Sequence, residues 1–401
     1  MTKYIRLLLV LSLIAGCVSC AKTGTVMINF ERKANTGIEV TMEYLVLDVP
    51  DCLVLGPVEQ IECDDDYIYI LSSVSGTAGV YVFDKVKGSY VGKIGRIGNG
   101  PDEYLLPFSF TVLEDCVCIV DGGKSRVLEY AGPPFRFISS YDIPDIGGFV
   151  IDSEGVIMAN VLDPTLCNHF SITTSGNESK TVYKVESNGS GYVTGPLKPL
   201  YEHDGHVHAY VQHFPVIYEL KGETLMEKYH LSFNGLDFPD KSYIRRISSG
   251  KQNYFKLLER SGYISYYDCH ETDDVLISMC IVNSDIFLGV YSKSSGEAVL
   301  YNEDELNDIS ISSSFFIAGV IDGMFAVAVP GSEISSGKLY NEILGDTCHK
   351  ISDNDIIIQM IMFKSDSFFE ANVEALANYE TGGDCHYVNG YTPCGRRCSS
   401  I

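Results

Sequence analysis

Apolar and polar residues alternate in short runs over most of the chain, from about residue 39 onward. The first such run covers residues 40–47 and reads VTMEYLVL. A period of two residues sends successive side chains to opposite faces of an extended strand, so these runs predict β-strands. Residues 254–260 (YFKLLER) depart from this pattern and predict a short helix.

One unit recurs along the chain, in which an acidic pair or an Asp-Gly turn precedes a run of alternating apolar residues. It occurs at residues 65–71, 114–120, 273–279 and 322–328. Asp65 and Asp115 lie 50 residues apart, and Asp274 and Asp322 lie 48 apart. A repeat near 50 residues that holds about four strands is typical of a propeller blade. The sequence therefore predicts an all-β fold, a six-bladed β-propeller over residues 39–366, with a two-sheet sandwich as the alternative.

Composition and charge restrict the partners of this protein. The 401 residues include 37 Gly and 26 Tyr but no Trp, and 45% of them are apolar, enough for a core. Asp and Glu total 53 against 29 Lys and Arg, which gives a formal charge of −24. Because nucleic-acid affinity comes largely from neutralising phosphates, this charge argues against a nucleic-acid partner and favours basic or neutral ones.

The N-terminal segment predicts export. Residues 1–16 hold two basic residues followed by an apolar stretch, as in a signal peptide. Residues 14–17 (IAGC) resemble the lipobox of bacterial lipoproteins, which implies that Cys17 carries the lipid. The alternatives are cleavage beside an ordinary Cys and lipidation of Cys20. We expect residues 17–38 to form a tether and the protein to be lipid-anchored in the cell envelope, at the outer membrane on its periplasmic or surface face.

The glycine-rich segment 93–104 reads KIGRIGNGPDEY and is followed by Leu-Leu-Pro. It resembles the linker between blades in the six-bladed β-propeller (TolB-like) lipoproteins of Bacteroidetes, where the usual text is GxxGxGPGEY. Asp102 replaces the commoner Gly of that motif. The matching residues are Gly95, Gly98, Gly100, Pro101, Glu103 and Tyr104. Residues 216–220 and 227–233 also resemble a hairpin of that family, and the resemblance implies a fold and an envelope location but no activity.

Residues 367–401 form a short Cys-rich tail that contains the letters NVEALA at 372–377. This tail resembles the NVEALA family of short exported Bacteroidetes peptides. Cys385, Cys394 and Cys398 are candidates for a small disulfide loop, which would leave one thiol for another partner. A zinc site that combines these cysteines with His386 is the alternative.

The densest set of metal-ligating side chains lies at residues 203–208 (HDGHVH). His206 and His208 point to one face of a strand, so His203, His206 and His208 are candidate Zn²⁺ ligands. Acidic runs at residues 64–66 and 303–305 are candidates for Ca²⁺, although carboxylates that begin turns account for most of them. Clustered histidines in a turn are more often solvated, so no cofactor is required.

No catalytic residue is identified from the sequence. A GxSxG elbow is absent from the sequence, and residues 95–100 precede Pro101 rather than a Lys-Ser or Lys-Thr pair, which excludes a P-loop and favours a turn between blades. The sequence favours a non-enzymatic, lipid-anchored scaffold that binds a protein or a glycan of the envelope. The alternatives are a metal-dependent hydrolase or lactonase-like propeller, and an export carrier for the NVEALA-like tail.

Overall fold

The computed structural model describes residues 24–32, 39–72, 76–143, 146–151, 157–161, 169–173, 179–184, 198–248, 253–306, 316–334 and 351–364. All of them belong to one compact unit, Met1–Ser365, and a second unit covers Asp366–Ile401. The predicted lipidation site at Cys17 and the predicted disulfide residues Cys385, Cys394 and Cys398 lie outside the described residues.

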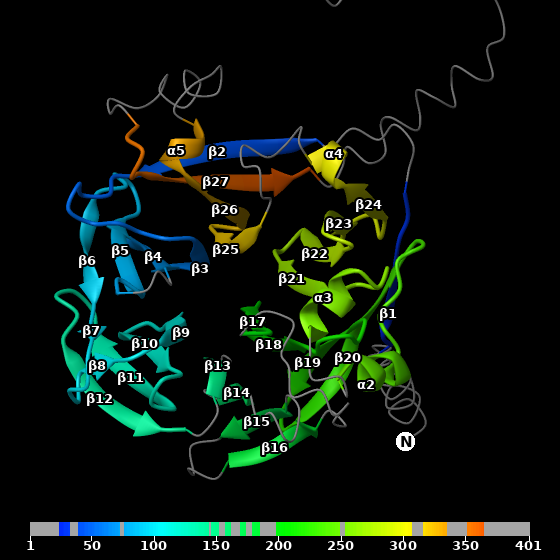
Figure 1. Ribbon diagram of the computed structural model, residues 1–401, viewed down its shortest axis with the longest axis horizontal. Coiled ribbons are helices and arrows are strands. Elements are labelled where there is room, and N and C mark those ends of the chain that lie inside the picture. Colours follow the sequence, from blue (N-terminus) through cyan, green and yellow to red (C-terminus); the bar gives the residue numbers. More distant parts are fainter. Residues whose placement is uncertain are drawn as a thin grey trace, which may run out of the picture. The chain divides into compact units, whose positions relative to one another are not determined.

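The described residues form six blades, each built on four antiparallel strands and numbered 1 to 6 in chain order (Figure 1). Blades 6 and 1 are joined in one eight-stranded sheet, and blade 4 has a fifth strand. Blade 1 holds β3 (Val58–Cys63), β4 (Tyr67–Ser72), β5 (Gly79–Asp84) and β6 (Tyr90–Ile94); blade 2 holds β9 (Pro107–Val112), β10 (Cys116–Asp121), β11 (Arg126–Ala131) and β12 (Phe137–Asp142). Blade 3 holds β13 (Ile146–Ile151), β14 (Ile157–Val161), β15 (His169–Thr173) and β16 (Ser179–Lys184); blade 4 holds β17 (Leu200–His203), β18 (His206–Tyr210), β19 (Val216–Lys221) and β20 (Thr224–Phe233). Blade 5 holds β21 (Tyr266–Glu271), β22 (Val275–Val282), β23 (Asp285–Ser292) and β24 (Ala298–Asn302). The predicted six-bladed β-propeller is confirmed, including the hairpin of β19 and β20.

Blade 6 is assembled from both ends of this unit. It holds β25 (Ile317–Ile321), β26 (Met324–Pro330) and β27 (Ile356–Phe363), and its outermost strand is β2 (Val40–Leu47). β2 pairs antiparallel with β27 along its whole length, and Figure 1 shows this blue strand beside the orange one. Blade 6 joins blade 1 through a parallel contact between Gly319 and Ile61. Hydrogen bonds between distant segments therefore close the sequence of blades.

The segment before β2 corrects one prediction. Val26–Phe30 forms strand β1, which pairs in parallel with β20 and becomes a fifth strand of blade 4. The expected tether over residues 17–38 is therefore wrong for this part. Ile28 and Phe30 are buried, and Glu31 also bridges to Val299 of blade 5. A short apolar run in a polar context acquires a strand conformation because it completes a hydrophobic contact between two blades.

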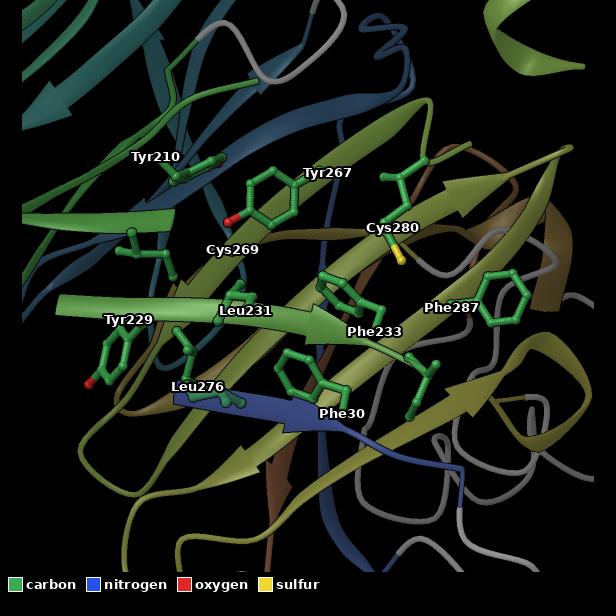
Figure 2. Close-up of a cluster of buried hydrophobic side chains, with 14 of the residues drawn as sticks. Phe30, Tyr210, Tyr229, Leu231, Phe233, Tyr267, Cys269, Leu276, Cys280 and Phe287 are labelled. Atoms are coloured by element: carbon green, nitrogen blue, oxygen red, sulfur yellow. The ribbon is translucent and has the colours of Figure 1, made fainter. Parts of the chain in front are cut away.

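Aromatic and aliphatic side chains fill the space between blades 4 and 5 (Figure 2). Phe30 of β1 stacks on Phe233 of β20 with ring centroids 4.9 Å apart. Tyr267 meets Tyr210 edge to face with centroids 5.3 Å apart. Such aromatic pairs add to the free energy gained from apolar burial, so this cluster holds the two sheets face to face.

Helices are few among the described residues and occupy connections. The predicted helix at 254–260 is confirmed as α3 (Tyr254–Glu259), and α2 (Lys241–Ser248) precedes it without having been predicted. Two short helices, α4 (Glu303–Leu306) and α5 (Gly331–Ile334), lie beside blades 5 and 6. Within the described residues no helix is long and apolar enough to cross a membrane.

Candidate ligand-binding cavity

The innermost strands of all six blades line one cavity of about 1520 Å³. These strands are β3, β9, β13, β17, β21 and β25. Because a propeller brings one edge strand of every sheet to its centre, side chains from the whole length of the fold converge there. The cavity has the central location expected of a ligand site, and its volume exceeds the range of about 300–1,000 Å³ that is usual for small-molecule pockets.

Carboxylates dominate the polar lining of this cavity. Ten carboxylate residues line it: Glu59, Glu62, Glu202, Asp204, Asp268, Glu271, Asp273, Glu333, Asp353 and Asp355. Lys198 is the single lysine or arginine among the described lining residues, and the lining also contains His203 and His270. A cleft lined by one sign of charge focuses its electrostatic potential, so this cavity attracts positively charged groups and hydrogen-bond donors.

Lys198 is already paired with the cavity wall. Its ammonium lies 2.7 Å from Glu62 and donates to the Phe110 carbonyl at 3.0 Å and to the Thr111 hydroxyl at 3.1 Å. The Gln60 amide also donates to Glu62, at 2.7 Å. These contacts join blades 1 and 2. They also neutralise the positive charge of Lys198.

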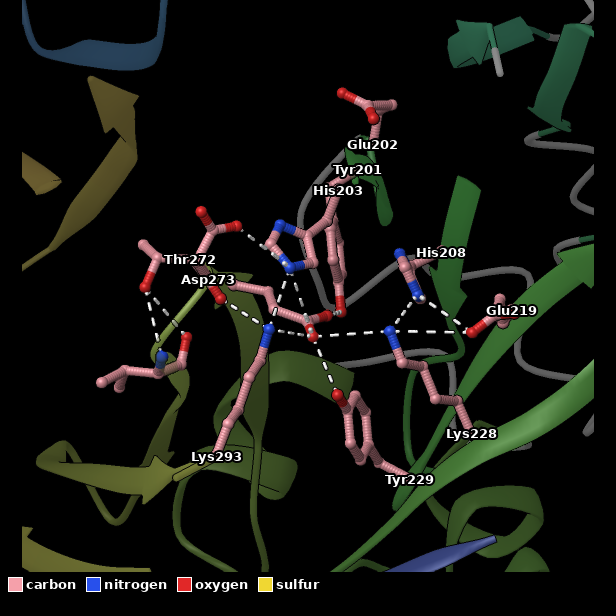
Figure 3. A network of polar contacts seen from close by, with 12 residues as sticks. Tyr201, Glu202, His203, His208, Glu219, Lys228, Tyr229, Thr272, Asp273 and Lys293 are labelled. Carbon is pink, nitrogen blue, oxygen red and sulfur yellow. Dashed lines mark hydrogen bonds and ion pairs between the residues drawn. The ribbon is translucent and has the colours of Figure 1, made fainter. Parts of the chain in front are cut away.

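Glu271 is the centre of a buried polar network at the boundary of blades 4 and 5. Figure 3 shows its partners Tyr201, Lys228, Tyr229 and Lys293. Its side chain is fully buried and accepts hydrogen bonds at 2.8 Å from the hydroxyls of Tyr201 and Tyr229. The ammonium of Lys293 lies 2.8 Å away and that of Lys228 3.5 Å away. A buried carboxylate needs such partners because desolvation penalises its charged form.

The protonation of Glu271 follows from these neighbours. Burial by itself raises the pKa of this carboxyl, but His208, Lys228 and Lys293 outweigh burial and lower the pKa to about 2. Glu271 is therefore ionised at neutral pH, with two ammonium groups held around it. The network fixes the position of β17 against β21, the two strands that supply Glu202 and Asp268 to the cavity.

The three histidines proposed as zinc ligands are only partly brought together. The rings of His203 and His208 have centroids 6.4 Å apart, whereas His206 is exposed. The Nε2 atom of His203 lies 2.9 Å from Lys293 Nζ, and that of His208 lies 2.8 Å from Lys228 Nζ. Burial lowers the pKa of His203. Among the described residues, no group of three or more His, Cys, Asp or Glu side chains has a metal-binding arrangement.

The acidic runs considered for Ca²⁺ serve as turn caps where the structure describes them. Asp64 accepts hydrogen bonds from the backbone N–H groups of Asp66 and Tyr67 and from the Tyr69 hydroxyl. Glu305 accepts from the backbone N–H of Asn302 at 2.7 Å. Carboxylates in such turns replace missing backbone partners.

The glycine-rich motif connects blade 1 to blade 2, as predicted. Within it, β7 (Arg96–Ile97) and β8 (Glu103–Tyr104) pair in parallel. The Glu103 carboxylate accepts hydrogen bonds at 2.6 Å from the Gly100 backbone N–H and from the Arg96 side chain. The Tyr104 hydroxyl, fully buried, donates to the Ile94 carbonyl at 2.9 Å.

Two glycines of this motif stand where a side chain would displace the Glu103 carboxylate or strain the backbone. A Cβ on Gly98 would lie 2.0 Å from the Glu103 carboxylate, and Gly95 has a φ of +62°. Lys124 also donates to the carbonyls of Gly98 and Glu103, at 2.8 and 2.9 Å. Gly95, Gly98, Gly100, Pro101, Glu103 and Tyr104 thus form a compact connection between blades, and none of them lines the cavity.

The sequence analysis did not identify Glu271, Lys228, Lys293 or Lys198. Each stands in an ordinary strand or loop and belongs to no motif. Glu271 is the last residue of β21 (YYDCHE), and a polar residue at the end of a strand is usually predicted to face solvent. These residues can be recognised as a group only in the folded protein, where segments far apart in the chain bring them together.

Comparisons with known proteins agree with this architecture. A family model described as a 6-bladed beta-propeller, DUF5128, matches residues 21–322, three quarters of the chain. The crystal structure of a Bacteroides fragilis protein predicted to be exported is similar over 84% of this chain and 99% of that one, with 23% identity and a TM-score of 0.75. A member of the duf4221 family from Bacteroides vulgatus is similar over 82% and 99%, with 10% identity and a TM-score of 0.52. No curated protein matches the chain.

Proposed function

We propose that this chain, which belongs to the DUF5128 family of six-bladed β-propellers, is a scaffold of the bacterial cell envelope that binds its ligand in the central cavity. The observation that carries the proposal is the convergence of all six innermost strands on one cavity with ten carboxylates. A rigid frame that presents many side chains to one space is suited to recognition.

The lining indicates which ligand chemistry the cavity accepts. Its one lysine is bound to Glu62, and the buried Glu271 is already compensated by Lys228 and Lys293. The exposed carboxylates of the lining, among them Glu202, Asp204 and Asp273, meet an incoming ligand. Carboxylates accept hydrogen bonds and attract positive charge. A protein segment with lysine or arginine side chains fits this cavity best, and a hydroxyl-rich glycan uses the same acceptors.

The proposed location rests on the first residues of the chain and on a neighbour. Residues 1–17 resemble a lipoprotein signal, with Cys17 as the lipidated residue. The similar protein of Bacteroides fragilis is itself predicted to be exported. Mass spectrometry of the mature protein tests the location: we expect residue 17 to be the first residue and to carry a diacylglyceryl group.

Calorimetric titration with a lysine-rich peptide and with neutral oligosaccharides tests ligand binding. We expect a double substitution in the cavity, Glu202→Gln with Asp273→Asn, to weaken peptide binding about tenfold or more, because two charge-assisted contacts disappear. Glu114→Gln with Asp115→Asn is the matched control, since these exposed carboxylates lie in the turn before β10, away from the cavity lining. Equal weakening by both variants would assign the binding to net charge rather than to the cavity.

A further inference from the structure

The connection between blades 4 and 5 differs in charge from the rest of the protein. Residues 240–260 contain six lysines and arginines and two acidic residues, in a chain whose formal charge is −24. This segment holds helices α2 and α3, which join β20 to β21. A local excess of positive charge on a strongly acidic protein indicates an anionic partner for this segment.

The two helices bury one side against each other. Ile244 and Ile247 of α2 pack with Tyr254 and Leu258 of α3 in a small hydrophobic cluster. Asp240 caps α2 by accepting a hydrogen bond from the backbone N–H of Tyr243 at 2.7 Å. Because these side chains face inward, the helical periodicity turns the remaining positions outward.

The outward side combines cations with large apolar side chains. Its exposed cations and large apolar residues are Lys241, Arg245, Arg246, Phe255, Lys256, Leu257 and Arg260, called the basic face below. Ser242, Asn253 and the acidic Glu259 are exposed beside them. Phe255 is 54% exposed and Leu257 46% exposed. An exposed pair of large apolar residues amid arginines and lysines is typical of helices that lie in a membrane interface, where the rings enter the headgroup region and the cations meet lipid phosphates.

We propose that the basic face docks this protein onto an anionic lipid surface. The proposal extends the proposed function only through the envelope location and is independent of the cavity. The acidic remainder of the protein does not cancel the attraction, because at physiological salt charges are screened over about 8 Å. Phe255 and Leu257 favour a lipid surface over an acidic protein, since a bilayer accepts apolar side chains at any point of contact.

Vesicle flotation with the full chain tests this proposal. Cys17→Ser removes the predicted lipidation site, so any binding comes from the folded protein. We expect at least tenfold stronger binding to vesicles of 30% phosphatidylglycerol in phosphatidylcholine than to phosphatidylcholine alone at low salt. Binding at 0.5 M NaCl is expected to fall severalfold.

Substitutions locate the binding surface. Arg245→Gln with Arg246→Gln should weaken binding about 25-fold, because each basic residue near an anionic membrane contributes about fivefold. Phe255→Ser with Leu257→Ser should weaken it at both salt concentrations. Lys87→Gln with Arg136→Gln removes two exposed charges elsewhere and should leave binding unchanged.

Three results would overturn the proposal: no preference for phosphatidylglycerol, equal effects of the two charge pairs, or a dimer in light scattering that Arg245→Gln with Arg246→Gln dissociates while vesicles remain unbound. The last result would assign the basic face to a second, acidic copy of the chain. Titration with the lysine-rich peptide separates the two proposals. The basic-face variants should keep peptide binding while they lose vesicle binding, whereas Cys17→Ser protein that binds vesicles but no peptide contradicts the cavity function alone.

Discussion

The ammonium of Lys293 in the turn after β23 lies 2.8 Å from the fully buried carboxylate of Glu271 at the end of β21. With Lys228 on the other side, Glu271 meets two cations from separate strands and loops. Replacing Glu271 by Ala leaves both lysines without their buried partner. We expect this substitution to lower the free energy of unfolding by roughly 3–5 kcal/mol, measured by chemical denaturation.

Asp273→Ala is the matched control for Glu271→Ala. This carboxylate lies two residues further along, and its side chain is 95% exposed. Exposed pairs contribute little, so we expect a change of at most about 1 kcal/mol. A comparable loss in both variants would mean that the Glu271 network does not stabilise the contact between blades 4 and 5.

Glu271 also makes stability depend on pH. Its pKa is lowered from 4.5 to about 2 in the folded protein, so the folded state binds fewer protons than the unfolded state between these values. The stabilisation is complete above about pH 4.5 and is lost as the pH falls toward 2, by roughly 3 kcal/mol. Glu271→Gln should flatten the stability profile between pH 5 and 3 by about 2 kcal/mol, the part of this loss that falls in that range.

Phe30 anchors β1 to the propeller. The side chain is fully buried and stacks on Phe233. Phe30→Ala removes this packing and should cost roughly 3–5 kcal/mol of unfolding free energy. Met27→Ala on the same strand, where the side chain is 59% exposed, should change stability by less than about 0.5 kcal/mol. Insensitivity to both substitutions would restore the description of this segment as a tether.

Gly319 permits the close approach of blades 6 and 1. A Cβ at this position would lie 2.1 Å from the backbone oxygen of Ile61. Gly319→Ala must push the two strands apart, and we expect a loss of roughly 1–3 kcal/mol in thermal or chemical unfolding. Gly92→Ala on β6, with no heavy atom within 4 Å, should be neutral within about 0.5 kcal/mol.

Zinc binding at His203, His206 and His208 is open to a direct measurement. The Nε2 atoms of His203 and His208 each lie within 3.0 Å of a lysine ammonium, so zinc has to displace Lys293 and Lys228 from Glu271. We therefore expect neither EDTA nor one equivalent of Zn²⁺ to shift the melting temperature. Stoichiometric zinc with a raised melting temperature, abolished by His203→Ala, would instead establish the three histidines as ligands.

The alternation of apolar residues and its repeat near 50 residues were sufficient to predict a six-bladed β-propeller, and the break in this pattern at 254–260 predicted the short helix. Strands and short helices depend on neighbours within a few residues, and a repeat of about 50 residues is typical of one propeller blade. The motif around Gly98 and Glu103 was placed correctly between two blades, because its turn is held by contacts within the motif itself.

The tertiary structure decided which distant segments meet. β1 pairs with β20 although Val26 and Tyr229 are some 200 residues apart, and nothing in the run VMINF specifies that partner. Likewise, Glu271 comes within reach of Lys228 and Lys293 only when blades 4 and 5 pack together. Local periodicity determines whether a residue is in a strand and which way it faces, whereas pairing and charge compensation across the chain depend on the packing of whole sheets.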